Sequence, residues 1–127
     1  MMLVKILLSI KPKYVERILN GTKRYEYRKK IFKNRNVNTV VIYATKPVGK
    51  VIGEFYIRNI IEDDPRTIWS LTNKYSGISK TSFDEYFHDV EEGFAIEIDK
   101  FVKYKKKLEL NEVSQRIKSA PQSFVYI

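Results

Sequence analysis

Charged side chains gather in one short segment, residues 23–28, which reads Lys-Arg-Tyr-Glu-Tyr-Arg and follows a glycine and a threonine. In a strand, Arg24, Glu26 and Arg28 would share one face, and the two tyrosines could join a core on the other. The Lys23 ammonium is a mobile point charge suited to a phosphate, whereas a guanidinium offers a planar fork to a phosphate or a guanine edge. An ionised Glu26 only accepts hydrogen bonds, so it either receives a ligand amine or hydroxyl or holds Arg28 in place. One interpretation of the segment is therefore a site for an anionic, nucleotide-like ligand.

A second interpretation of the same segment is purely structural. Charged residues are depleted in strands, and those on an edge strand discourage edge-to-edge aggregation. Under this interpretation the three charges of the strand are solvated and bind no ligand. The pattern of residues 23–28 alone leaves both interpretations open.

The segment also belongs to a set of motifs that occur in order along the chain. Gly21, Lys23, Glu26 and Arg28 fit the pattern G-x-K-x-x-E-x-R. The other motifs are SIKP at residues 9–12, IYAT at 42–45, GISK at 77–80 and PQSF at 121–124. With them the chain resembles the ASCH family over almost its whole length. It is similar in particular to stand-alone prokaryotic ASCH proteins described as predicted transcriptional regulators, and the family is related to the PUA domains that bind RNA.

This resemblance implies a PUA-like α+β fold, a small, mostly antiparallel β-barrel flanked by about three helices. It also implies a basic cleft beside the barrel, with Lys23, Glu26 and Arg28 at its floor, that binds RNA or a modified nucleotide in a regulatory role. No cofactor or metal is expected. The expected ligand-binding residues are Ser9, Lys11, Lys23, Glu26, Arg28, Lys29, Lys30, Thr45 and Lys46. The tyrosines expected to stack on unpaired bases are Tyr25, Tyr43, Tyr104 and Tyr126.

The alternative is a small hydrolase that acts at the same cleft on RNA or on a modified nucleoside such as acetylated cytidine. The resemblance implies Lys23 and Glu26 as its catalytic residues, although a threonine tends to replace the glutamate in the amidohydrolase branch. A nucleophilic lysine needs a depressed pKa. Arg24 beside Lys23 would lower that pKa, but Glu26 would favour the charged ammonium. This argument favours binding over catalysis and leaves the enzyme question open.

Composition and charge narrow the class of protein. The 127 residues predict a single domain, residues 1–127, and they include no cysteine, so disulfides and zinc-thiolate sites are excluded. No apolar run reaches the roughly 18 residues of a membrane helix, and a cytoplasmic protein is expected. Residues 1–60 carry 14 Lys and Arg against 3 acidic residues, whereas residues 61–99 carry 3 against 10. This separation predicts a basic face that meets a polyanion.

Hydrophobic periodicity and turn residues place the elements that must hold the site. Pro12 suits a helix start, Gly21 a helix end, and Asp64 a helix cap. Gly53 inside a strand indicates a bend or a close approach of another backbone. The expected strands cover 3–10, 23–28, 39–45, 50–61, about 93–101 with a bulge near 99–100, and 123–127. The expected helices cover 12–20, 64–76 and about 81–90, and 29–38 is expected to be a basic loop. Trp69 is expected in the core and the only histidine, His88, on the surface.

Overall fold

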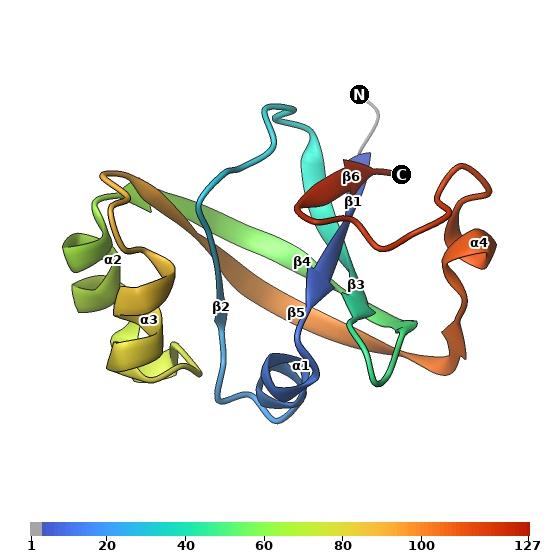
Figure 1. The fold of residues 1–127 in the computed structure, drawn as a ribbon, viewed down its shortest axis with the longest axis horizontal. Helices are drawn as coiled ribbons and strands as arrows, with labels where there is room; N and C mark the ends of the chain where they lie inside the picture. Colours follow the sequence, from blue (N-terminus) through green and yellow to red (C-terminus); the bar gives the residue numbers. More distant parts are fainter. Residues whose placement is uncertain (1–3) are drawn as a thin grey trace.

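The chain folds around one curved, six-stranded sheet with short helices packed at its sides (Figure 1). The computed structural model describes residues 4–127. The strands are β1 (Val4–Ile10), β2 (Tyr25–Arg28), β3 (Val37–Ala44), β4 (Lys50–Asp63), β5 (Gly93–Leu108) and β6 (Phe124–Tyr126). The α-helices are α1 (Pro12–Leu19), α2 (Pro65–Thr72), α3 (Lys80–Tyr86) and α4 (Leu110–Val113), and a 3-10 turn, η1 (Asn73–Tyr75), follows α2. No helix within residues 4–127 has the length and apolar character needed to cross a membrane.

The strand order is β2-β5-β4-β3-β1-β6, and only the β1–β3 pair is parallel. The α+β class and the mostly antiparallel sheet are therefore confirmed. The full closure of the barrel is not reached, because β2 and β6 are the two ends of the strand order and the sheet forms a half-barrel. The consequence for the site is that β2, which carries Glu26 and Arg28, is an edge strand with β5 on one side only.

Two long strands, β4 and β5, bend the sheet. Gly53 allows this because a Cβ at that position would lie 2.5 Å from the carbonyl oxygen of Val102, closer than real Cβ atoms come. The β4–β5 register also skips Asp99, since Tyr56 pairs with Lys100 and Ile57 with Ile98. The close backbone approach at Gly53 and the bulge near Asp99 are both confirmed.

The helix ends follow local capping chemistry. Asp64 accepts a hydrogen bond from the Thr67 backbone amide at 2.8 Å, as expected for the cap of α2. Ser79 caps α3 in the same way, through the amide of Ser82 at 3.1 Å. The expectation that this second helix runs to about residue 90 is wrong, because α3 ends at Tyr86 and Asp89 takes a left-handed φ of 59°. The segment between β5 and β6 contains the short helix α4.

Two clusters of apolar side chains fix the parts of the fold that matter for the site. The larger cluster fills the sheet against α1 and includes Ile6, Ile42, Phe55 and Ile96, all fully buried. A second cluster packs Tyr27 of β2 against Ile68, Phe83 and Phe87 of α2, α3 and the residue after α3. Trp69 joins this cluster, with its ring centroid 4.8 Å from that of Phe83, so its core position is confirmed. His88 lies on the surface, as expected, with its side chain 79% exposed.

Candidate functional site

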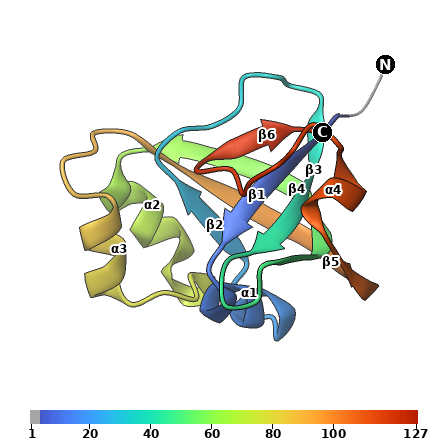
Figure 2. The same cartoon turned by 45° about the vertical axis from the view of Figure 1, so that its right-hand side comes forward.

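A pocket of about 530 Å³ opens between the end of β1, α1, β2 and α3. Figure 2 shows how these elements are arranged: α2 and α3 lie on one side of β2, and α1 lies below it. Ser9, Ile10 and Lys11 come from the end of β1, and Lys13 and Tyr14 from α1. The other lining residues are Lys23, Glu26, Tyr27, Arg28, Ile78, Ser82, Glu85 and Tyr86. Three of the expected motifs, at residues 9–12, 21–28 and 77–80, therefore contribute to a single pocket.

Lys23 is the most buried charged side chain in this pocket. Only 2% of the residue is exposed, and its Nζ donates a hydrogen bond of 2.8 Å to the carbonyl oxygen of Ser76. The same Nζ lies 5.2 Å from the ring centroid of Tyr14 and 4.8 Å from that of Tyr27, within cation–π range of both. The expected mobile point charge is wrong, because the ammonium is held between two rings and a carbonyl group.

The segment after η1 is shaped to receive Lys23. Gly77 has a φ of 63°, and a Cβ there would lie 2.3 Å from the Cβ of Lys23, so only glycine leaves room for the lysine stem. Arg17 Nη1 donates to the carbonyl oxygen of Gly77 at 2.8 Å, and the Lys23 backbone amide donates to the carbonyl oxygen of Arg17 at 2.9 Å. These contacts join three parts of the chain around the Lys23 side chain: α1, the residues just before β2, and the segment after η1.

Burial changes the acid–base chemistry of Lys23. Desolvation lowers its pKa from 10.5 to about 8, the nearby Glu26 carboxylate opposes this shift, and the positive charge of Arg17 adds to it. The sequence argument weighed Glu26 against Arg24 and concluded that the ammonium form would persist. Burial, the dominant cause of the shift, was absent from that argument, and the cation that acts on Lys23 is Arg17 and not Arg24.

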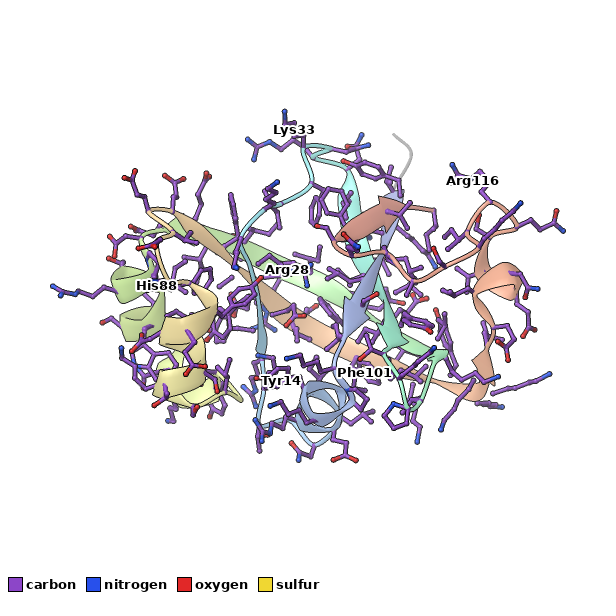
Figure 3. The ribbon with its side chains drawn as sticks, in the orientation of Figure 1. Tyr14, Arg28, Lys33, His88, Phe101 and Arg116 are labelled. Atoms are coloured by element: carbon purple, nitrogen blue, oxygen red, sulfur yellow. The ribbon has the colours of Figure 1, made fainter. Side chains whose placement is uncertain are left out.

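Glu26 is the second buried charged group of the pocket. It is 7% exposed, and desolvation raises the pKa of its carboxyl group, whereas the charges of Lys23 and Arg28 lower it. No salt bridge joins Glu26 to either cation among residues 4–127, so the carboxyl is not held by direct pairing. Arg28, labelled in Figure 3, is half-buried at the end of β2 and lines the pocket beside Glu26.

The remaining expected binding residues separate into two groups. Ser9 and Lys11 line the pocket, although the Ser9 hydroxyl already donates to the carbonyl oxygen of Pro121 at 2.8 Å. Four others lie outside the lining. They are Lys29, Lys30, Thr45 and Lys46. Their binding roles, like those of the lining residues, stay predictions.

The aromatic residues of the pocket differ from the expected set. None of Tyr25, Tyr43, Tyr104 and Tyr126 lines it, and Tyr43 is buried in the core. The lining tyrosines are instead Tyr14, Tyr27 and Tyr86. Tyr14 and Tyr86 lie on α1 and α3, where an apolar stripe that faces a core and one that faces a pocket have the same periodicity. Burial raises the pKa of Tyr27 to about 12, so its hydroxyl is neutral at ordinary pH.

The motifs of this pocket can now be compared with known proteins. The model of the ASCH domain matches residues 8–109. The chain belongs to the ASCH family. The ASCH match includes every residue that lines the pocket, from Ser9 to Tyr86. The ASCH family inferred from the order of the motifs is thereby confirmed, whereas the particular likeness to transcriptional regulators is not supported.

Relatives of this chain share different amounts of it. An ASCH domain-containing ribonuclease of Zymomonas mobilis is 32% identical over 88 residues, which are 69% of this chain and 60% of the relative. The large ribosomal subunit protein uL22 of Ureaplasma parvum is 27% identical over 122 residues, or 96% of this chain and 39% of the relative. The chain thus spans less than two thirds of the length of these relatives. A crystal structure of ASCH from Zymomonas mobilis matches with a TM-score of 0.85 at 26% identity, and covers 97% of this chain and 87% of that chain.

Proposed function

We propose that this ASCH domain binds single-stranded RNA in the pocket and cleaves its backbone, with Lys23 as the group that accepts a proton. The observation that carries the proposal is the burial of Lys23, which lowers its pKa to about 8 and so provides neutral amine near neutral pH. The similarity to an ASCH domain-containing ribonuclease supports RNA as the substrate class. Neither the pocket nor these relatives point to transcriptional regulation, and the proposal does not include it.

The walls of the pocket suit a nucleotide. Lys11 and Lys13 are exposed at the α1 side, and Arg28 lies at the opposite side on β2, so cations flank the space where a phosphate would enter. The rings of Tyr14 and Tyr86 supply flat apolar surfaces for a base, and stacking of this kind contributes about 1 to 3 kcal/mol per base in single-strand binders. The pocket therefore offers both parts of nucleotide recognition.

The proposed reaction is an internal transesterification. The ribose 2′-oxygen attacks the adjacent phosphorus while its proton passes to the neutral Nζ of Lys23, and the bond from phosphorus to the 5′-oxygen breaks. Water supplies the proton to the departing 5′-oxygen, which leaves one strand with a 2′,3′-cyclic phosphate and the other with a 5′-hydroxyl. Arg28 stabilises the charge that develops on the phosphate oxygens. A neutral Lys23 keeps N–H groups, so it can donate to the Ser76 carbonyl while its lone pair receives the proton.

The test uses RNA oligomers with a single 2′-deoxy substitution at the cleaved position. We expect the wild-type protein to cleave all-ribose RNA to a 2′,3′-cyclic phosphate and to leave the substituted oligomer intact. The rate should rise with pH and level off above about 8, because the active form is the neutral amine. Intact all-ribose RNA, or equal cleavage of both oligomers, would overturn the proposal.

One observation keeps a second candidate, an amidohydrolase of acetylated cytidine. The same lowered pKa makes Lys23 a nucleophile, and this removes the electrostatic argument against catalysis. In this reaction Nζ attacks the acetyl carbon, the bond to the cytidine N4 breaks as N4 takes a proton, and water then releases acetate and restores the amine. Release of cytidine from acetylated cytidine, with RNA left intact, would favour this candidate over RNA cleavage.

A further inference from the structure

A second groove, of about 540 Å³, lies outside the pocket described above. One wall is formed by residues 31–35 of the loop that joins β2 to β3 and by residues 37–38 at the start of β3. The other wall is formed by residues 57–60 and Glu62 of β4 and by Phe94 of β5. We call it the loop groove. The groove is lined by residues of the basic loop, which have no part in the proposed reaction.

The loop groove is lined by both apolar and polar side chains, among them the acidic Glu62, and carries cations at its rim. Ile31, Ile60 and Phe94 are among its apolar lining residues. Lys33 and Arg35 are exposed at its rim, and no salt bridge involves either of them within residues 4–127. Apolar and aromatic surface beside free cations suits the bases and phosphates of a single strand.

The loop groove adjoins the pocket at one pair of neighbouring residues. Arg28 lines the pocket, and Phe94, its partner in the β2–β5 register, lines the groove. Lys29 and Lys30 are exposed in the stretch of chain between Arg28 and the first groove residue, Ile31. In Figure 3, Arg28 lies between Tyr14 at the pocket and Lys33 at the top of the loop. A line of positive charge thus leads from one site to the other.

We infer that the loop groove holds the nucleotides of a single-stranded RNA that extend beyond the one seated in the pocket. The inference rests on the proposed function and specifies its substrate: a strand of several nucleotides, gripped at two places, and not a free nucleoside. It also gives roles to Lys29 and Lys30, which lie outside the pocket lining, as phosphate contacts along the connecting stretch.

The experiment compares binding of a uridine dinucleotide and a uridine octamer by fluorescence anisotropy. Both are 2′-O-methylated throughout, so that 2′-oxygen attack cannot cleave them. Wild-type protein should bind the octamer at least tenfold more tightly than the dinucleotide. The double variant Lys33→Gln/Arg35→Gln should weaken octamer binding at least fivefold and leave dinucleotide binding within twofold. Its salt dependence should fall by about 1.4 in log–log slope, at about 0.7 per lost phosphate contact on a single strand.

The matched control is Lys105→Gln/Lys106→Gln, which removes two exposed charges from the far end of β5 and should change octamer binding less than twofold. The inference is overturned if the Lys33/Arg35 variant binds the octamer as the wild type does, or if the control loses as much affinity. An octamer that binds as described but stays intact when unmethylated would overturn the proposed cleavage alone. A wild-type protein that binds neither length would overturn both.

Discussion

The lysines at the far end of β5 and the lysine of the pocket differ in their exposure to water. The far end of β5 carries four exposed lysines, Lys103, Lys105, Lys106 and Lys107, whereas the pocket holds one buried lysine, Lys23. The exposed cluster has the higher charge density, but its amines face water. Lys23 is surrounded by two tyrosine rings and a carbonyl group, and desolvation lowers its pKa to about 8. Charge density therefore indicates where a polyanion is attracted, and burial indicates where a proton can move.

The same contrast holds for two glycines with nearly equal backbone angles. Gly77 and Gly49 have φ values of 63° and 62°. A Cβ on Gly77 would meet the Cβ of Lys23 at 2.3 Å, but the nearest atom to a Cβ on Gly49 is the Tyr43 hydroxyl at 3.6 Å. The left-handed backbone is common to both, and the space for the lysine is specific to Gly77.

The largest effect is expected from substitution of Lys23 itself. Lys23→Arg keeps a positive charge but offers no neutral amine, so RNA cleavage should fall at least a hundredfold while octamer binding stays within a few-fold. The longer side chain in a packed site should lower the free energy of unfolding by about 1 to 3 kcal/mol. Initial cleavage rates and denaturant unfolding provide the two measurements.

Lys23→Met is the control for that packing cost, since it keeps an unbranched chain of similar length. Removal of the buried charge should stabilise the folded protein, whereas the Ser76 carbonyl oxygen that is left without its donor should destabilise it. The free energy of unfolding should therefore stay within about 1 kcal/mol of the wild-type value. Cleavage should again be lost. If either variant cleaves RNA at the wild-type rate, the amine has no part in the reaction.

The next effect in size separates the two glycines. Gly77→Ala should lower the free energy of unfolding by about 2 to 4 kcal/mol and reduce cleavage at least tenfold, because strain from the φ angle adds to the displacement of Lys23. Gly49→Ala should show only the backbone strain, about 1 to 2 kcal/mol, with cleavage unchanged. Equal losses of activity in the two variants would mean that Gly77 has no special relation to Lys23.

A smaller effect is expected in the pH dependence of stability. Between pH 8 and 10 the folded protein releases the Lys23 proton while the unfolded chain keeps it, so the free energy of unfolding rises with pH through this window. At 1.36 kcal/mol per pKa unit, the rise attributable to Lys23 is about 2 to 3 kcal/mol. Urea unfolding of the wild type and of Lys23→Met at several pH values isolates it. Parallel curves for the two proteins would be incompatible with a lowered pKa.

The smallest effect belongs to the exposed cluster. Lys105→Gln/Lys106→Gln should change the free energy of unfolding by less than about 0.5 kcal/mol, because exposed charges contribute little to stability. Cleavage should stay within twofold of the wild type. A loss comparable to that of Gly77→Ala would remove the distinction between the two lysine regions.

Much of the fold could be predicted because it depends on local signals. Pro12 and Asp64 marked two helix starts, and Gly53 marked the close approach to Val102. The predicted end of α3 was wrong because Asp89 adopts a left-handed φ angle, and the sequence has no glycine at that position to indicate one. The resemblance implied a barrel, whereas the sheet is a half-barrel with β2 and β6 at its two ends. Strand periodicity carries no information on whether the two end strands of a sheet meet.

The site was harder to predict because its environment comes from distant parts of the chain. The motif residues Lys23, Glu26 and Arg28 could be identified from their types and spacing. The burial of Lys23 was not, since it depends on Ser76 and Gly77, more than fifty residues later. Tyr14 and Tyr86 were missed as pocket residues because a helix stripe that faces a pocket has the same period as one that faces a core.

The central claim, that burial makes Lys23 a partly neutral amine near neutral pH, has a direct measurement. Protein labelled with ¹³C at the lysine Cε positions can be titrated by NMR, with Lys23→Met used to assign the Lys23 resonance. The account predicts that this resonance titrates near pH 8. A Lys23 resonance that titrates above pH 10, at the ordinary value for lysine, would contradict the account.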